Sequence, residues 1–369
     1  MDENMVTPYL VEFYDESLNL IHHDQIAYEQ FTNKFDYLSL VENSIYVSYS
    51  ENVRKRCFVR LKNNQYDDLF IVTSVDNAEN DMMTVYFKGL IALLDISVNF
   101  DTKTQGNASL EGEIADIIKG RYINNSDSYN NIPCLNIPIE TSTTTIWGFN
   151  LKADVEEGRY IALNSFYETI VSKSLSKYGI VVNFIPNYET RSVNIVVGTI
   201  STAPKIIESE LSNILAKNII IRESNSDVNK LIVYDGTSAA ISPSKITYYL
   251  HSDGTFDTNN TDRLSPVVEI VKNVDTTDTT LAAEAEAQAL DIFGGIQYNN
   301  LIEVTVLNDD EMIKPSDLVI GQLVSVKYQG VNYDSILTGY ERSSTTKLIF
   351  GTIRIELSKI IKGTFIFLF

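Results

Sequence analysis

The chain has 369 residues, a formal net charge of −20 and a sequence pI of about 4.5, and it is long enough for two or more domains. This excess of acids excludes binding to nucleic acid through neutralised phosphates, which requires clustered Lys and Arg. Since no apolar run reaches the ~20 residues of a membrane-spanning helix and the N-terminus lacks a signal-like apolar run, we expect neither a membrane anchor nor export by a cleaved signal.

The first part of the chain has the pattern of short strands joined by polar turns. Apolar residues alternate with polar ones around Tyr9–Phe13 and Cys57–Lys62, and the run Asp67–Val75 follows an Asn-rich turn. Strands of this length and spacing are typical of antiparallel barrels and sandwiches. We therefore predict a β-barrel over residues 1–102.

The pattern changes to helices after a polar linker at residues 101–109. Apolar residues recur at helical spacing from Leu110, and Gly120 is the predicted end of that helix. A second helix is predicted over Asn164–Tyr178, because Ser165 and Glu168 have the spacing of a capping box and Gly179 can end it. Two strands follow this helix, so residues 103–205 are predicted to hold a helix and an αββ-type domain.

Strand-like sequence returns at Ile206. We predict a second barrel from residues 206–265 and 296–362, interrupted by a helical insertion at 266–295 whose Ala- and Glu-rich helix spans Thr280–Phe293. The chain ends in an apolar segment, GTFIFLF, at residues 363–369. An exposed run of this kind promotes aggregation, so we expect it to be buried. Burial on its own barrel and burial against a neighbouring subunit both remain open.

Metal, nucleotide and nucleophile motifs do not occur in the sequence. His22 and His23 point to opposite faces of any strand, and His251 lies in a turn. Without H-x-x-x-H or C-x-x-C spacing, zinc chemistry is not predicted. Cys57 and Cys134 are expected to be buried thiols, although a single disulfide stays open. We predict no catalytic, metal or cofactor-binding residue.

Three acidic clusters could in principle supply chemistry, because a glycosidase needs only two carboxylates. They are Asp309 with Asp310 and Glu311, the stretch Asp154–Glu157, and Asp257–Asp262, which has oxygen ligands at alternate positions as in a calcium loop. The last stretch lacks the Gly and the terminal Glu of an EF-hand. Acids in polar turns between strands are more typical of a solvated rim.

The stretch Asn308–Glu341, in which the first of these clusters lies, has the pattern of a barrel wall. Val324 and Val326 share one strand face, the segment QGVN is a predicted tight reversal, and Tyr333 begins the inward face of the return strand.

The order of these segments resembles phage tail-tip hub proteins. The resemblance rests on the helix ending in Gly-Gly at Gly295, on D-L-x-x-G-x-x-V-x-V at Asp317–Val326, and on Y-D-S-x-L-T-G-Y at Tyr333–Tyr340. The passage Asp67–Asp95 is similar to an early strand–turn–strand segment of the same proteins. The chain is most similar to the short tail-associated (Tal) proteins of lactococcal siphophage baseplates, which are related in fold to the hubs of contractile tails.

This resemblance implies an α+β, mainly β fold with two similar antiparallel barrels, an αββ-type domain and helical insertions. It implies a homotrimeric ring that joins the hexameric distal tail (Dit) ring protein. The tape-measure protein and receptor-binding proteins are further partners that it suggests, with viral DNA as passing cargo. The protein would be made in the bacterial cytoplasm and lie at the tail tip of the virion. There it would close or open the channel for DNA during host entry.

The resemblance implies a structural protein and not an enzyme, because the peptidoglycan hydrolase of the long family members has no counterpart in these residues. A cell-wall glycan hydrolase and a host-carbohydrate-binding tail protein are the two alternatives. The 21 Tyr residues permit a carbohydrate-binding surface, but they equally suit subunit interfaces.

Overall fold

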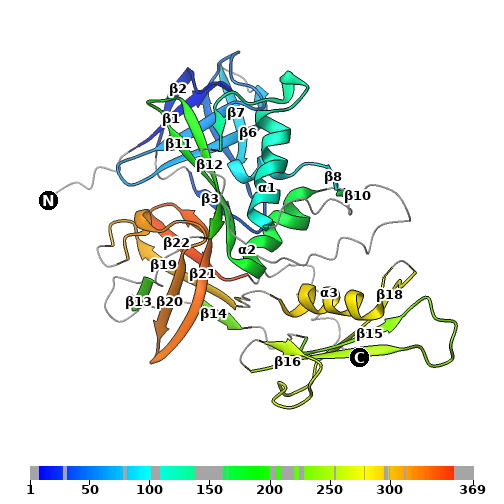
Figure 1. The fold of residues 1–369 in the computed structure, drawn as a ribbon. Helices are drawn as coiled ribbons and strands as arrows, with labels where there is room; N and C mark the ends of the chain where they lie inside the picture. The colour runs from blue at the N-terminus through cyan, green and yellow to red at the C-terminus, as the bar shows by residue number, and fades with distance from the viewer. Residues whose placement is uncertain are drawn as a thin grey trace, which may run out of the picture.

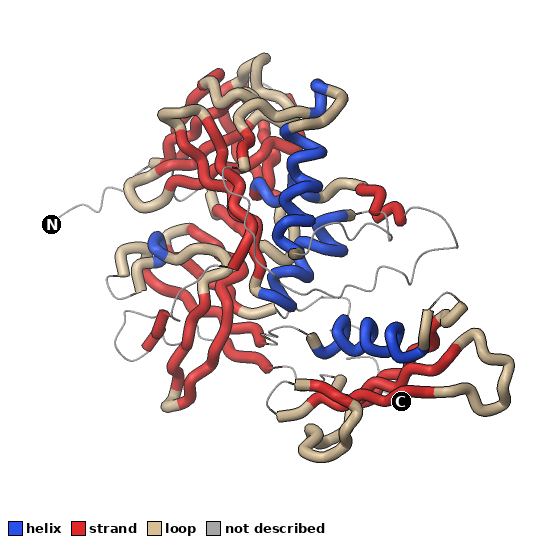
Figure 2. The backbone as a smooth tube through the Cα atoms, in the orientation of Figure 1, coloured by secondary structure: helices blue, strands red, loops and turns tan. Residues whose placement is uncertain are grey.

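The computed structural model shows a mainly β protein whose helices pack along the flanks of its sheets (Figures 1 and 2). It describes residues 8–27, 31–77, 81–100, 109–137, 161–163, 165–199, 205–208, 220–223, 228–252, 255–277, 279–294, 298, 300–310 and 313–352. The acidic stretch at 154–157, Glu311 and the apolar segment at 363–369 lie outside these residues.

Six antiparallel strands form the N-terminal sheet in the order β2-β1-β5-β6-β7-β4. They are β1 (Tyr9–Tyr14), β2 (Leu20–Ile26), β4 (Glu42–Ser48), β5 (Phe58–Lys62), β6 (Asp67–Asn77) and β7 (Met82–Gly89). The alternation read from the sequence is present, since Val11, Phe13, Val59 and Leu61 are completely buried on the inner face.

The two edge strands of this sheet approach each other, so that the sheet curls into a half-barrel. His22 Nε2 on β2 lies 3.1 Å from both the carbonyl oxygen and Oγ of Ser48 on β4. Asp24 Oδ2 accepts hydrogen bonds from Ser48 N at 2.7 Å and from Ser48 Oγ at 2.9 Å. Side chains therefore bridge the gap that backbone pairing leaves open.

Strand β3 (Asn33–Asp36) lies in the N-terminal part of the chain but pairs with the second sheet. Its residues run antiparallel to Gly339–Arg342 of β21. On its other side, the buried Asn43 of β4 imitates a strand: Lys34 N donates to Asn43 Oδ1, and Asn43 Nδ2 donates to the Lys34 carbonyl. Through β3, the N-terminal part of the chain is thus hydrogen-bonded to the second sheet.

The second sheet has the order β13-β20-β21-β22-β19-β14, with β3 beside β21. Its strands are β13 (Lys205–Glu208), β14 (Ile220–Glu223), β19 (Asn300–Leu307), β20 (Leu323–Tyr328), β21 (Val331–Arg342) and β22 (Thr345–Phe350). As the sequence predicts, Val324 and Val326 face a buried core. Gln329 and Gly330 both have positive φ, which is the geometry of a tight type I′ hairpin turn.

Helices and a three-stranded sheet make the middle layer. Helix α1 (Leu110–Ile118) continues as a π-helical turn through Ile123, so Gly120 does not end it, contrary to the prediction. The predicted second helix is a π-helical turn followed by α2 (Ser172–Tyr178); Ser165 Oγ accepts a hydrogen bond from Glu168 N, and Gly179 ends the helix with φ +65°. The three-stranded sheet consists of β9 (Leu135–Asn136), β11 (Ile180–Asn187) and β12 (Ser192–Thr199), and β8 (Val98–Phe100) pairs separately with β10 (Ile161–Leu163).

Residues 228–294 contain a sheet and a helix that pack together, a grouping that differs from the predicted one. Its sheet has the order β17-β16-β15-β18, and α3 (Leu281–Phe293) covers one face (Figure 1). The strands are β15 (Lys230–Asp235), β16 (Lys245–Leu250), β17 (Phe256–Asp257) and β18 (Glu269–Val274). We expected residues 206–265 in the second barrel and 266–295 in a separate insertion. Instead β18 lies parallel to β15, and α3 seals the core around Leu231 and Val233.

Candidate functional site at the junction of the sheets

A cavity of about 720 Å³ lies where the N-terminal sheet, the β11–β12 hairpin and the second sheet meet. The N-terminal part contributes Phe35, Tyr37, Gln65, Tyr66, Asp67, Asp68, Leu69, Phe70, Leu90 and Ile91; the hairpin contributes Val182, Asn183, Phe184, Ile185 and Pro186; the second sheet contributes Ser316, Leu318, Val319, Ile320, Tyr340 and Arg342. The walls are therefore mostly apolar, with a few polar groups, as is usual for binding cavities.

A buried ion pair across the two sheets stands at the wall of this cavity. Arg342 on β21 is 6% exposed and contacts the carboxylate of Asp68 on β6 through Nη1. Its guanidinium lies between the rings of Tyr66 and Tyr340, at 4.0 and 3.7 Å from their centroids. Burial disfavours the charged guanidinium, but the Asp68 carboxylate and the Tyr340 and Tyr66 side chains together outweigh this effect and raise the pKa of Arg342.

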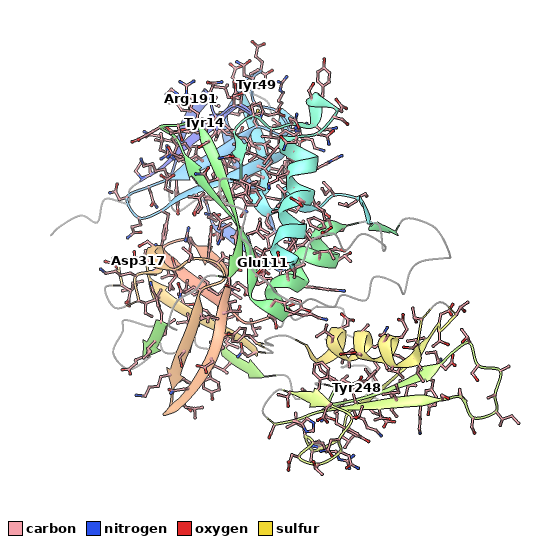
Figure 3. All side chains as sticks on the ribbon, in the orientation of Figure 1. Tyr14, Tyr49, Glu111, Arg191, Tyr248 and Asp317 are labelled. Atoms are coloured by element: carbon pink, nitrogen blue, oxygen red, sulfur yellow. The ribbon has the colours of Figure 1, made fainter. Side chains whose placement is uncertain are left out.

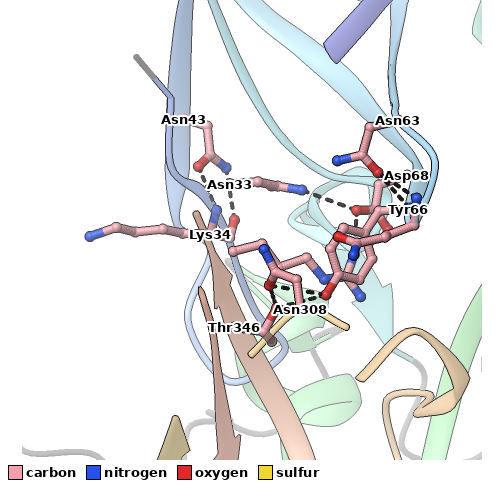
Figure 4. A network of polar contacts seen from close by, with 10 residues as sticks. Asn33, Lys34, Asn43, Asn63, Tyr66, Asp68, Asn308 and Thr346 are labelled. Carbon is pink, nitrogen blue, oxygen red and sulfur yellow. Dashed lines mark hydrogen bonds and ion pairs between the residues drawn. The ribbon is translucent and has the colours of Figure 1, made fainter. Parts of the chain in front are cut away.

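Hydrogen bonds extend this pair into a network that joins β3, β6 and β22 (Figure 4). Asn33 Nδ2 donates to Asp68 Oδ2 at 3.1 Å. The Tyr66 hydroxyl lies 2.7 Å from Thr346 Oγ1, which donates to Asn308 Oδ1 at 2.6 Å. Breaking one member leaves buried polar groups unsatisfied, and for this reason such a network fixes one arrangement of the sheets.

A second charged cluster holds the β11–β12 hairpin on the N-terminal sheet. Arg60 on β5 binds Asp67 through two hydrogen bonds of 2.6 Å and Glu12 at 2.9 Å. Its guanidinium lies 3.7 Å from the ring centroid of Tyr188, in the turn of the hairpin. Burial opposes the charge of Arg60, but the hydrogen bonds, above all those with Asp67, raise its pKa overall.

Tyr37 connects all three layers directly after β3. Its side chain is 1% exposed; its hydroxyl oxygen accepts a hydrogen bond from Val182 N at 2.9 Å, and its carbonyl accepts one from the Tyr167 hydroxyl at 2.6 Å. Burial raises the pKa of Tyr37. The junction is thus fixed on each side by buried polar contacts.

The cavity does not present a pair of uncommitted carboxylates. The acids among the described residues that line it are Asp67 and Asp68, and each is bound to an arginine. A glycosidase needs two carboxylates that can reach the substrate, and both of these carboxylates are engaged by arginine side chains. Chemically, the arrangement suits a rigid joint with an apolar groove.

The acidic clusters weighed from the sequence are turn elements where the structure describes them. Asp310 is 2% exposed and accepts a hydrogen bond from Ile313 N at 2.9 Å, while Asp309 is exposed. Asp257 Oδ1 accepts from Asn259 N at 2.6 Å and lies 3.0 Å from His251 Nε2. The structure brings none of these described acids to the cavity.

The two cysteines are free and buried, so the disulfide left open from the sequence does not form. Burial raises the pKa of the Cys134 thiol to about 12 and also raises that of Cys57. Among the described residues, no group of three or more His, Cys, Asp or Glu is arranged to hold a metal ion. None of the described helices is both long and apolar enough to cross a membrane.

Sequence reasoning missed the junction residues Asp68, Arg342, Tyr66 and Asn33. One signal was available: Arg342 follows Tyr340 on the inward face of an alternating strand, and a buried Arg requires a buried acid. The sequence does not say which acid supplies that partner, since Asp68 lies more than 270 positions away.

Comparisons with known proteins bear on the fold as a whole. The chain matches no protein-family model and no curated protein. Its structure is similar to the crystal structure of the prophage MuSo2 43 kDa tail protein from Shewanella oneidensis, with a TM-score of 0.51 and 11% identity over 93% of this chain and 98% of that one. This similarity extends over nearly the whole of both chains and shows a shared fold.

Two further solved structures resemble the chain less closely. A prophage tail protein gp18 from Listeria monocytogenes EGD-e gives a TM-score of 0.47 at 12% identity, covering 96% of this chain and 97% of that one. A chain of the phage P2 baseplate in its activated conformation gives 0.47 at 12% identity, covering 94% and 100%. The structural neighbours are therefore phage tail and baseplate proteins.

Proposed function

We propose that this protein is a structural component of a phage tail, and specifically a trimeric hub at the tail tip. The observation that carries the proposal is the fold shared with a 43 kDa tail protein over 93% of this chain. The order of sequence motifs from Asp67 to Tyr340 supports the same class independently of the coordinates.

The arrangement of sheets supports the finer part of the proposal. One chain carries two large sheets, so three copies would present six. A ring of six such units would match a hexameric distal tail ring to a three-fold tip. The tape-measure protein and receptor-binding proteins are further proposed partners. Three copies at −20 each would also line the tail tip with acids, which disfavours adhesion of passing DNA.

The contacts at the junction suit a protein in which the two large sheets must keep a fixed relative position. Asp68 and Arg342 bind the two sheets directly, and Arg60 with Tyr188 holds the hairpin over their contact. In the proposed hub, this joint would keep both sheets of a subunit in register with the ring, while opening of the channel would take place between subunits.

The proposal is tested by mass in solution. The purified protein, alone and co-expressed with the distal tail ring protein of the same phage, is measured by size-exclusion chromatography with light scattering. We expect a trimer, which is three times 41.5 kDa or about 125 kDa, or a trimer seated on a hexameric ring. A monodisperse monomer that never joins the ring would contradict it.

A cell-wall glycan hydrolase is the alternative that the acids leave to be tested. A zymogram on host cell walls decides it, and arginine pairing of Asp67 and Asp68 leads us to expect no clearing. A glycan array decides the carbohydrate-binding alternative in the same way.

A further inference from the structure

One loop of the 228–294 unit combines apolar character with full exposure. The connection between β15 and β16 runs from Gly236 to Ser244 and contains no charged residue. At its tip, Ala239 and Ala240 are exposed, and Ile241 is 104% exposed. In a chain that carries 49 acids and 29 bases, this uncharged projection carries at its tip the most exposed large hydrophobic side chain among the described residues.

Hydrogen bonds at the base of this hairpin fix the position of its tip. Asp235 N donates to the Ser244 carbonyl at 3.0 Å, which closes the loop. Asp235 Oδ1 accepts hydrogen bonds from Thr237 Oγ1 at 2.6 Å and Thr276 Oγ1 at 2.8 Å. Gly236 N donates to the Val274 carbonyl of β18 at 2.8 Å.

The junction cavity offers a surface of the same character elsewhere on the chain. Its rim carries Ile185 and Val319, which are 52% and 48% exposed, and Phe184 and Leu318 lie beside them in the wall. Its acids Asp67 and Asp68 are neutralised by arginines, so an acidic neighbour can approach without facing unpaired negative charge. The volume of about 720 Å³ is ample for an Ala-Ala-Ile tip.

The two features lie on different sides of the molecule, so one copy does not bring them together. Figure 3 labels Asp317, between the cavity residues Ser316 and Leu318, on one side, and Figure 1 shows the 228–294 unit on the other. Contacts between different patches of identical subunits run head to tail, and they close into a ring when the rotation permits.

We propose that the Ala239–Ile241 tip of each copy inserts into the junction cavity of the next copy, and that this contact closes the trimer. This inference rests on the proposed function, which supplies the ring. The uncharged tip allows three strongly acidic chains to meet at apolar surface, where buried side chains supply the attraction and repulsion is least.

Disulfide trapping tests the contact directly. Ile241→Cys and Val319→Cys variants, each carrying a different tag, are mixed and oxidised, and we expect a covalent dimer that contains both tags. The double variant should give linked species up to three copies and no larger. Cys57 and Cys134 are 4% and 3% exposed and do not compete. The matched control is Val331→Cys, at a 50% exposed site where β21 begins, which should not link to Ile241→Cys.

A second variant keeps the test independent of cysteine chemistry. Ile241→Asp places a charge at an exposed tip, so the monomer should fold unchanged, while the trimer should be lost at concentrations at which the unaltered trimer persists. If the protein is a trimer, the cysteine variants do not cross-link and Ile241→Asp assembles as well as the unaltered protein, then this inference is wrong. The proposed function would still stand. A protein that stays monomeric even with the ring protein overturns both.

Discussion

Arg342 is a buried cation held by Asp68 and by the rings of Tyr66 and Tyr340. We expect Arg342→Ala to lower the free energy of unfolding by about 3 kcal/mol, because it leaves the half-buried Asp68 carboxylate without its cation. The measurement is scanning calorimetry of the purified protein. The control is Arg263→Ala: Arg263 is exposed and 5.7 Å from the Tyr249 ring, so its loss should cost less than about 0.5 kcal/mol.

The double variant Asp68→Leu with Arg342→Met removes the ion pair without leaving an unpaired carboxylate, so it distinguishes these two sources of lost stability. If desolvation of an orphaned carboxylate causes the loss, the double variant should be more stable than Arg342→Ala alone. Equal stability of the two variants would contradict this account of the joint.

Asp24 gives the half-barrel a dependence on acid. Burial raises its pKa, but hydrogen bonds from the Ser48 and Gln25 amides outweigh this effect, and the pKa is lowered overall. A carboxylate with a lowered folded pKa stabilises the fold above its unfolded pKa of ~3.9, and this contribution disappears as the pH falls through the folded pKa.

We therefore expect Asp24→Asn to reduce the melting temperature at pH 7, by the equivalent of about 1 kcal/mol, and to make no difference near pH 2. Melting curves of both proteins from pH 2 to pH 7 measure this. The exposed Asp309→Asn serves as the control. A difference between Asp24→Asn and the unaltered protein that persists at pH 2 would show that geometry, and not charge, closes β2 onto β4.

At the scale of elements, β3 depends on close approach to β21. A Cβ added to Gly339 would lie 2.7 Å from the Phe35 carbonyl oxygen, which is closer than packing allows. Gly339→Ala should push β3 away from β21 and cost about 1–3 kcal/mol. Hydrogen exchange should show faster exchange of the β3 amides. Gly120→Ala is the matched control, since an added Cβ there meets nothing within 4 Å.

Local patterns in the sequence predict local structure well here. The helix capped by Ser165 and ended by Gly179, and the hairpin turn at Gln329 and Gly330, follow from residues that are neighbours in the chain. The helix after Leu110 continues past Gly120 as a π-helical turn, so a glycine at the end of the periodic segment does not mark the end of the helix. Such cases depend on a few contacts that no pattern encodes.

Strand partners and the junction could not be predicted in the same way. The residues Asn33–Asp36 do not indicate that this strand pairs with β21. The sequence of β15 likewise does not indicate that β18 is its neighbour. Both choices depend on surfaces that exist only after other elements have packed. The cavity is a product of three such packings, so its lining comes from segments that the sequence keeps far apart.

At the scale of the whole molecule, charge would govern assembly of the proposed trimer. Each copy carries −20, and like charges on neighbouring subunits repel over the Debye length of ~10 Å at 0.1 M salt. We expect trimer formation to strengthen as NaCl rises from about 20 to about 300 mM, because salt screens this repulsion while apolar contacts remain. Analytical ultracentrifugation over a dilution series measures it. A trimer that weakens with salt would show that ion pairs dominate the contact.

The pairing of β3 with β21 also determines the order in which the newly synthesised chain can fold. Asp36 must wait for Gly339, about 300 positions later, before its strand has a partner. At ribosomal speeds of ~5–20 residues per second, that wait lasts roughly 15–60 s. During it the remaining strands of the first sheet can pair among themselves, while β3 offers an open edge to any passing chain. A chaperone that covers this four-residue strand until β21 has been synthesised would shield the open edge during this interval.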